Sequence, residues 1–346
     1  MTPPIRTALL GFGLAGRVFH APALAANARF DLAVIVTGDP GRRDEARAAH
    51  PGAEILSWDQ WDAGVPGLEL VVVATPPATH AARAHAALEA GADVVVDKPF
   101  TVTSAEGEAL IGLAAARERV LSTYQNRRWD GEFLTLRRLL ADGALGQVQR
   151  FESRLERRRQ GAGKPWKAAA TPADGGGVLY DLGSHLIDQA LVLFGPVSRV
   201  YGEVAARRPG GKNDDDAFVA LTHDSGVVSH LWMNLSAASR GPRLRVLGSD
   251  AAYVKWAPDG QEAQLQAGIL PGDALYGVDP EDAWGVLGVD GDTVPVPTER
   301  GNFAAYYDEL AAAIRAGGPV PVDPADSVAA LRIIEAVLGQ GVRDHG

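Results

Sequence analysis

The first third of the chain repeats one pattern: a short run that is apolar along its whole length, then a segment that suits a helix. Because each run lacks a polar face, it fits a strand covered on both sides, as in a parallel sheet between layers of helices. Residues 1–122 are therefore predicted to form a doubly wound α/β domain that binds ligands at the carboxyl ends of its strands. The predicted strands are 5–10, 31–37, 68–74 and 94–96, and the predicted helices are 17–27, 42–50 and 78–90.

From Tyr124 onward the pattern changes. Asp130 is expected to N-cap a helix whose Phe133, Leu136 and Leu140 share an apolar face. Apolar and polar residues then alternate along short segments, which is typical of strands with one solvated face. Residues 123–346 are predicted to form an α+β domain with a large, mainly antiparallel open sheet. Its expected strands are 151–156, 217–222, 227–232, 243–247, 252–256 and 262–265, its expected helices are 303–315, 327–338 and one that ends at Phe194, and loops are expected within 260–292.

Composition narrows the class of protein. The 346 residues, 46% of them hydrophobic, are enough for two cores rather than one. The absence of cysteine excludes disulfide bonds, thiol nucleophiles and zinc sites built on thiolates. The first residues lack the pattern of a secretory signal, and no apolar run reaches membrane-spanning length. We therefore expect a soluble cytoplasmic protein with no membrane partner.

Charge argues against one class of partner. A net charge of −10 disfavours broad affinity for nucleic acids, whose phosphates favour a basic surface. One basic cluster departs from this balance, formed by Arg154, Arg157, Arg158 and Arg159. A solvated strand end explains this cluster better than a nucleic-acid site does. The expected partner is a small molecule.

Three glycines follow the first predicted strand with G-x-G-x-x-G spacing. Gly11 suits a tight turn, Gly13 lets a diphosphate approach the backbone, and Gly16 allows close packing of the next helix. The first N–H groups of that helix then face the phosphates. A glycine-rich turn with no ligand is the alternative. The expected cofactor contacts are Gly11, Phe12, Gly13, Leu14, Ala15 and Gly16, with Thr75, Pro76 and His80 after a later strand.

The end of the second strand bears on the choice of cofactor. Enzymes specific for NAD place an acidic side chain there, roughly 20 residues past the glycines, to hold the ribose 2′-hydroxyl. Here that position is Thr37, with Arg42 and Arg43 close behind. A hydroxyl and a guanidinium suit a 2′-phosphate, so NADP is favoured. Asp39 is close enough to serve NAD instead.

Lys98 is one of only five lysines in the chain, and it follows a predicted strand at the ligand edge and precedes Pro99. A lysine held there, partly desolvated beside a cofactor, can donate a hydrogen bond to a substrate oxygen. The alternative is a strand-end lysine whose ammonium group reaches solvent. The residue is both a candidate catalytic group and a candidate cofactor contact.

A second candidate group precedes Phe194. Asp181, His185 and Asp188 have i, i+4, i+7 spacing and so share one helical face, while Leu182, Leu186 and Leu193 are expected on the buried side. A histidine beside a carboxylate can accept a hydroxyl proton near neutral pH. A structural His–Asp pair and a weak metal site are the alternatives, and no metal is expected.

Four motifs in order resemble the Gfo/Idh/MocA oxidoreductases over essentially the whole chain. They are the glycine-rich start, the Asp97-Lys98-Pro99 tripeptide in the place of a Glu-Lys-Pro signature, the run Asn126-Arg127-Arg128-Trp129-Asp130, and Asp181-x-x-x-His185. The first and third look most like the NADP-dependent scyllo-inositol dehydrogenase branch. The resemblance implies a Rossmann domain, an α+β domain and an active site between them.

The resemblance also implies the chemistry. It is hydride transfer between a hydroxyl-bearing carbon of a sugar or polyol and C4 of a nicotinamide. His185 would be the general base, Lys98 would polarise the same oxygen, and Asp181 would orient the substrate. Arg127, Trp166 and the loop around Lys164 would contact substrate. A cis Lys98–Pro99 bond and a homodimer or homotetramer are expected, the latter because an open sheet buries its apolar face.

Two rival functions occur on the same scaffold. One is a cofactor-binding regulator without catalysis, which has no need of Lys98, Asp181 and His185. The other is glycoside cleavage through transient oxidation by a tightly held NAD. The sequence does not specify which sugar or polyol, which carbon or which direction.

Overall fold

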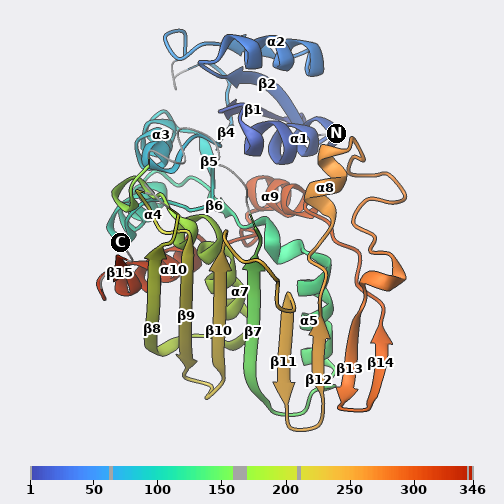
Figure 1. Cartoon of the computed structure of the whole chain (residues 1–346). Coiled ribbons are helices and arrows are strands. Elements are labelled where there is room, and N and C mark those ends of the chain that lie inside the picture. The colour runs from blue at the N-terminus through green and yellow to red at the C-terminus, as the bar shows by residue number, and fades with distance from the viewer. Residues whose placement is uncertain (1, 62–64, 159–169, 209–211, 341–342, 345–346) are drawn as a thin grey trace. The chain divides into compact units, whose positions relative to one another are not determined.

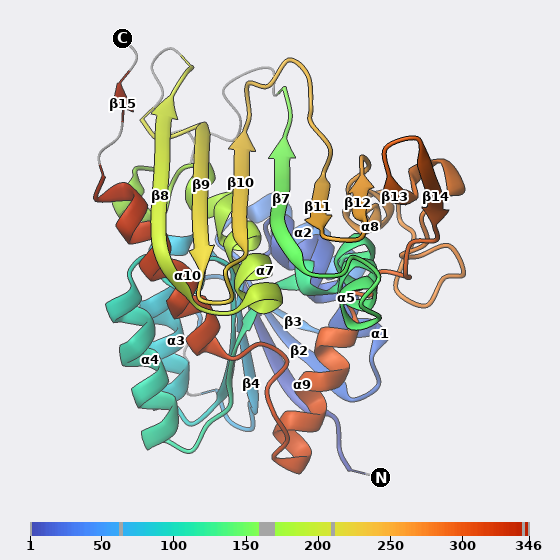
Figure 2. The ribbon, with the colours of Figure 1, turned by 90° about the horizontal axis from the view of Figure 1, so that it is seen from below.

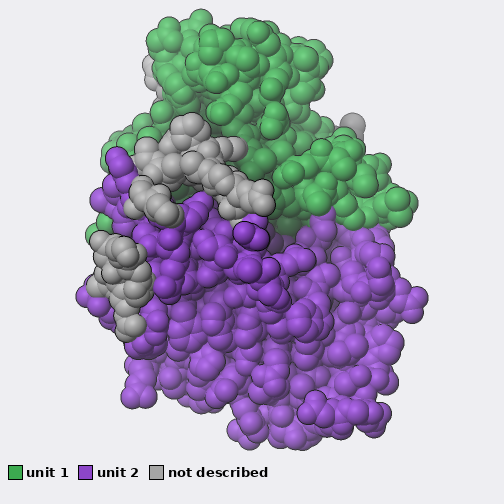
Figure 3. Space-filling model, in the orientation of Figure 1, with its two compact units in different colours: residues 1–126, 261–276, 302–328 green, residues 127–260, 277–301, 329–346 purple. Residues whose placement is uncertain are grey.

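The computed structural model of the chain describes residues 2–61, 65–158, 170–208, 212–340 and 343–344. Two compact units are formed (Figure 3), one by residues 1–126, 261–276 and 302–328 and the other by 127–260, 277–301 and 329–346. The segments 261–276 and 302–328 thus belong to the first unit, whereas a single domain boundary at residue 122 would assign them to the second domain.

The first unit contains a six-stranded parallel sheet with strand order β3-β2-β1-β4-β5-β6. Strand β4 and the three valines of β5 are apolar and fully buried, as the sequence pattern predicts for a sheet covered on both faces. The order reverses between β1 and β4, which is the doubly wound arrangement. The strands are β1 (Ile5–Leu10), β2 (Phe30–Val36), β3 (Glu54–Leu56), β4 (Leu70–Val73), β5 (Asp93–Asp97) and β6 (Leu121–Tyr124).

Helices cover both faces of this sheet. Figure 2 shows α3 and α4 on one side and α1 and α9 on the other. The segment 262–265, expected as a strand, lies in helix α8; its sequence Glu-Ala-Gln-Leu has strong helix formers and no β-branched residue, so that prediction was wrong. The helices are α1 (Ala21–Ala26), α2 (Pro40–Ala49), α3 (His80–Glu89), α4 (Ser104–Ala116), α8 (Gln261–Gln266) and α9 (Ala305–Ala316).

The second unit contains a nine-stranded sheet with the order β14-β13-β12-β11-β7-β10-β9-β8-β15. It is mainly antiparallel, with parallel pairing of β7 to β10 and of β8 to β15. The predicted hairpin is present, with Val228 opposite Thr222. The strands are β7 (Val148–Glu156), β8 (Val197–Ala206), β9 (Asp216–His223), β10 (Val228–Asn234), β11 (Leu244–Gly248), β12 (Ala252–Lys255), β13 (Gly285–Val289), β14 (Asp292–Val296) and β15 (Arg343–Asp344).

Helices α5 (Gly131–Ala141), α7 (Ser184–Phe194) and α10 (Pro324–Leu338) complete the structure, and Figure 1 shows α7 behind β10 and β7. Alternate residues of β9 and β10 are buried toward α7, which leaves the opposite face of these strands half-exposed. No helix among the described residues is long and apolar enough to cross a membrane.

Candidate active site

The loops after β1 and β4 meet at the point where the strand order reverses. A Cβ on Gly11 would overlap the backbone oxygen of Ala74, which shows how closely the two loops approach. In doubly wound sheets, a crevice outside the carboxyl ends of the strands at this point binds the ligand. The glycine-rich turn and residues 74–77 therefore form the candidate ligand site of the first unit.

The three glycines of the motif have different reasons to be glycine. Gly11 has φ +101°, and a Cβ on Gly16 would overlap the carbonyl oxygen of Gly11, so the fold itself requires both. Gly13 has no such constraint, because a Cβ there would find only Arg42 Nη1, 4.0 Å away. The space at Gly13 is thus a cradle that a side chain would fill, as a diphosphate site requires.

The helix after the glycines opens toward the same space. Its first turn is π-helical over Ala15–His20 and continues into α1, and no side chain caps it. Phe12 is buried, while Leu14 is exposed at the rim and Ala15 is half-buried. An uncapped helix start supplies N–H donors and positive potential to an anion, so these residues fit a dinucleotide diphosphate.

The residues after β2 are those that the sequence pattern assigns to the adenosine ribose of a cofactor. Thr37 is buried, and its N–H donates to Leu56 O at 3.0 Å. Asp39 N-caps α2, because its Oδ1 accepts from the Arg42 N–H at 2.9 Å. The Asp39 carboxylate therefore already has a structural role, while the Arg42 side chain is exposed near the cradle.

The loop after β4 holds the next group of expected cofactor contacts. Thr75 is half-buried and Pro76 is exposed, whereas His80 is buried. The His80 Nε2 lies 2.7 Å from Thr75 O, and its Nδ1 lies 2.9 Å from Pro99 O. Burial lowers the pKa of His80, and the hydrogen bonds to these backbone carbonyls oppose that effect. This histidine links the Thr75 loop to the residue after Lys98.

Lys98 follows β5 directly and is half-buried. Its backbone N–H donates to Asp97 Oδ1 at 2.8 Å. The Lys98–Pro99 bond is cis, which confirms that expectation. The carboxyl end of β5 is beside that of β4, so the lysine belongs to the same edge as the glycine cradle.

The second unit supplies the predicted histidine. Its helix begins with a π-helical turn, Leu179–Gly183, before α7. The turn is held by Asp214, whose Oδ2 accepts from the Leu179 N–H at 2.8 Å. A Cβ on Gly177 would overlap the Asp214 carboxylate, so this glycine makes room for it. Burial raises the Asp214 pKa to about 6.

The polar face predicted for this helix is more buried than expected. His185 and Asp188 are buried and Asp181 is half-buried, so the polar residues share the interior with Leu186. Asp188 forms a bidentate pair with Arg128, with distances of 2.8 Å from Nε to Oδ2 and 2.6 Å from Nη2 to Oδ1. This pair anchors the helix three residues after His185. Among the described residues, no group of three or more His, Asp or Glu is arranged to hold a metal ion.

Arg127, the expected substrate contact, is directed by Asp130, whose Oδ2 lies 3.1 Å from Arg127 Nη1. Asp130 occupies the N-cap position of α5, but its side chain makes no capping bond; the Gly131 N–H instead donates to Asp259 at 2.8 Å. The capping role expected of the Asp130 side chain was therefore wrong. The other expected contact, Trp166, and Lys164 lie outside the described residues.

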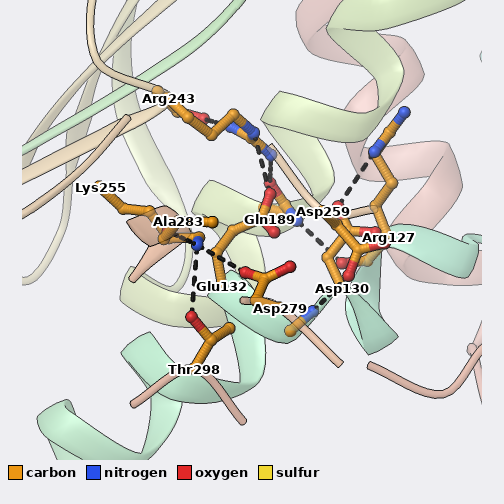
Figure 4. Close-up of polar contacts among 12 residues, drawn as sticks. Arg127, Asp130, Glu132, Gln189, Arg243, Lys255, Asp259, Asp279, Ala283 and Thr298 are labelled. Atoms are coloured by element: carbon orange, nitrogen blue, oxygen red, sulfur yellow. Dashed lines mark hydrogen bonds and ion pairs between the residues drawn. The ribbon is translucent and has the colours of Figure 1, made fainter. Parts of the chain in front are cut away.

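A buried ionic network extends from Arg127 (Figure 4). Gln189 of α7 donates to Arg127 O at 2.9 Å and accepts from Arg243 at 3.1 Å. Arg243 also pairs with Glu132, 3.0 Å from Nε to Oε1. Burial raises the pKa of both Asp130 and Glu132. The network ties α7 to α5 and to the residues that hold Arg127.

Comparison with known families gives a consistent result. Residues 5–125 match the oxidoreductase family with an NAD-binding Rossmann fold, and residues 133–254 match the GFO/IDH/MocA C-terminal domain. The chain belongs to the Gfo/Idh/MocA oxidoreductase family. It is therefore an NAD(P)-dependent oxidoreductase with a Rossmann domain.

Individual members of the family are similar to this chain over nearly its full length. The oxidoreductase YdgJ of Escherichia coli is 39% identical and covers 97% of this chain and 96% of its own. The scyllo-inositol 2-dehydrogenase (NADP(+)) IolW of Bacillus subtilis is 35% identical, with 96% and 93% covered. The structure of the oxidoreductase YvaA from Bacillus subtilis superposes with a TM-score of 0.91 at 34% identity, covering 98% of this chain and 96% of that one.

Sequence reasoning missed some residues that support the candidate site in this Gfo/Idh/MocA protein. Asp214 stands in a run of three aspartates, and nothing local indicates that it caps a helix start 35 residues earlier in the chain. Arg128 was part of a recognised motif, but its partner Asp188 is 60 residues away. The run of three glycines that ends at Gly177 is the local signal in the sequence, and the structure shows that Gly177 adopts a positive φ beside the Asp214 carboxylate.

Proposed function

We propose that the protein transfers a hydride between a secondary hydroxyl carbon of a sugar or polyol and the nicotinamide of NADP. The nicotinamide, when bound, supplies the hydride acceptor or donor at its C4. One observation carries the proposal: the chain combines a cradle at Gly13, which a side chain would fill, with a lysine at the ligand edge and a buried histidine on an anchored helix. A protein that only binds cofactor needs neither side chain.

In this proposal Lys98 and His185 act on the same substrate oxygen. His185 removes the hydroxyl proton during oxidation and returns it during reduction. The Lys98 ammonium group donates a hydrogen bond to that oxygen and stabilises the negative charge that develops on it. Asp181 orients the substrate and balances the positive charge of the other two groups. Arg127 and Trp166 are proposed to bind further substrate hydroxyls.

NADP is proposed over NAD on the residues after β2. The Arg42 side chain is exposed near the cradle, whereas the Asp39 carboxylate caps α2. A guanidinium favours a 2′-phosphate, and a capping carboxylate is less available to a ribose hydroxyl. Arg42→Ala should raise KM for NADP and leave KM for NAD nearly unchanged. Equal changes in both would contradict the preference.

An inositol-like polyol is the proposed substrate class, because the relative IolW is named for scyllo-inositol and NADP. The test is nicotinamide absorbance with a panel of inositols and aldoses, using NADP and NAD, for the native chain and for Lys98→Ala and His185→Ala. Turnover that both substitutions abolish while cofactor still binds supports the proposal. Tight binding without turnover favours a regulator, and retained cofactor without net reduction favours glycoside cleavage.

We also propose that two or four copies assemble through the half-exposed face of the second sheet. Tyr201 is 46% exposed there, beside the Phe218 ring, and the Arg154 guanidinium lies 3.8 Å from the centre of the Trp232 ring. Such an aromatic face is typical of a contact between protein surfaces. Sedimentation that shows only monomer would refute this assembly, and Phe218→Glu should shift the native chain toward monomer.

A further inference from the structure

A buried histidine faces the side chain of Asp97, the residue before Lys98. His20 is the last residue of the π-helical turn that follows the glycine cradle, and its side chain is completely buried. Its ring packs against Tyr124, with centroids 4.3 Å apart. Histidine is a costly filler for such a position, because a buried imidazole needs partners for both nitrogens.

The two ring nitrogens of His20 have different surroundings. Nδ1 lies 2.6 Å from the hydroxyl oxygen of Tyr307 on α9. Nε2 has no hydrogen-bond partner among the described residues, and it faces Asp97 Oδ1 at 4.0 Å. That same Asp97 oxygen accepts the backbone N–H of Lys98. A chain of polar groups thus runs from Tyr307 through His20 and Asp97 to the lysine.

Chemistry selects one tautomer for the ring. Burial lowers the pKa of His20 to about 4; Asp97 raises it by a smaller amount and His80 lowers it further, so the ring is neutral near pH 7. A neutral imidazole has one N–H. A proton on Nε2 faces a carboxylate and leaves Nδ1 to accept the Tyr307 O–H, whereas a proton on Nδ1 would turn a lone pair toward Asp97. The first arrangement is the favourable one.

We propose that His20 is a positioning residue for Lys98: Tyr307 holds its Nε2–H toward Asp97, and the Asp97 carboxylate holds the lysine backbone. The gap of 4.0 Å closes to a hydrogen bond by a shift of about 1 Å, because N–H···O bonds lie near 2.9 Å. His20 and Gly16 belong to one helical turn, so the ring is held by the segment that follows the glycine motif. The inference rests on the proposed function.

Two substitutions of His20 distinguish a role in positioning Lys98 from a role in packing alone. His20→Gln keeps an N–H donor at the place of Nε2, whereas His20→Asn keeps a polar atom only at the place of Nδ1. We expect His20→Asn to lower kcat about tenfold to a hundredfold, as misplaced catalytic groups do, with KM for NADP nearly unchanged. His20→Gln should recover most of the loss. Equal losses in both variants, in proportion to a fall in Tm, would overturn the inference in favour of packing.

A double-mutant cycle tests the path through Asp97. If His20 acts through the carboxylate, the variant carrying both His20→Asn and Asp97→Asn should lose no more kcat than the worse single variant. Additive losses would overturn the path.

A readout without turnover separates this inference from the proposed function. Ring ¹⁵N NMR of the native chain at pH 7 should show His20 neutral with its proton on Nε2, and Tyr307→Phe should weaken that preference. A proton on Nδ1 would overturn the inference even in an active enzyme. Absence of turnover with every polyol, together with the Nε2–H tautomer, would refute the proposed function and leave the arrangement of the ring established.

Discussion

Two helix starts in this protein look alike and are completed differently. Both begin with a π-helical turn after a glycine-rich stretch, Ala15–His20 in the first unit and Leu179–Gly183 in the second. At the first, Gly13 leaves space and no side chain caps the turn. At the second, Gly177 makes the same kind of space, but the Asp214 carboxylate fills it and accepts the Leu179 N–H.

The difference shows what a glycine before a helix can mean. Both starts provide N–H donors that favour an anion. At one start the chain itself supplies the hydrogen-bond acceptor, Asp214, which fixes the helix that carries His185. At the other no side chain caps the turn, and it is the start proposed to bind the phosphates of a cofactor. A π-helical turn at each is in keeping with the frequent occurrence of such turns at functional sites.

The largest expected effect is the loss of kcat on substitution of His185 in α7. His185→Ala should lower kcat by about 10² to 10⁴, the range for loss of a general base, while cofactor affinity stays the same because the cradle is in the other unit. Stopped-flow turnover and fluorescence titration with NADP measure the two quantities. A loss of cofactor affinity equal to the loss of kcat would show that cofactor binding and proton transfer are not separated between the two helix starts.

The pH dependence of stability should reveal the buried Asp214 carboxyl group at the second helix start. The folded-state pKa of Asp214, about 6, exceeds its ordinary value of 3.8, so the folded chain binds more protons than the unfolded chain between these values. The carboxyl therefore lowers stability as pH rises from about 4 to 6, by about 3 kcal/mol in total. Relative to the native chain, Asp214→Asn should gain that amount across this window in denaturant unfolding.

His20 in the first unit provides a control of opposite sign. Its folded-state pKa, about 4, lies below its ordinary value of 6.5, so stability is lost as pH falls through this interval. His20→Gln should remove a rise of stability with pH, whereas Asp214→Asn should remove a fall. The same change of slope in both variants would contradict the burial argument for one of them.

Gly13→Ala should damage the open helix start selectively. The methyl group finds only Arg42 Nη1 at 4.0 Å, so Tm should hardly change, yet it occupies the space proposed for phosphate. We expect affinity for NADP to fall roughly tenfold to a hundredfold, or about 1.4–2.8 kcal/mol. Gly16→Ala is the matched contrast, since its methyl group would overlap the Gly11 carbonyl and should lower Tm as well. Unchanged affinity in Gly13→Ala would remove the cradle from the proposal.

The smallest expected effect concerns the anchor of α7. Arg128→Lys keeps the charge but loses the bidentate geometry with Asp188, which we expect to cost about 1 kcal/mol of stability. A fewfold fall in kcat should accompany it, because His185 is three residues away on the same helix. Thermal unfolding and initial rates measure both. A fall in stability with kcat unchanged would limit the pair to a structural role.

Much of the fold could be predicted because its signals are local. Runs such as 70–73 and 94–96 are apolar throughout, so they identify buried parallel strands without knowledge of their neighbours. The short strand β3 and the helix at Gln261–Gln266 were not predicted, because their local sequence signals are weak. Three residues carry no periodicity, and a short polar segment takes the structure that its packing allows.

For the candidate site, the sequence by itself determined the chemical groups: a glycine motif, a lysine after an apolar strand, and a histidine near two aspartates. Only the tertiary structure decided which groups support them, because Asp214, Tyr307 and Asp188 reach their partners across 35 to 287 residues of chain. It also decided that, of the three glycines, only Gly13 could carry a Cβ without overlapping the backbone. Local spacing specifies which side chains are available, whereas burial and hydrogen-bond partners are properties of the packed chain.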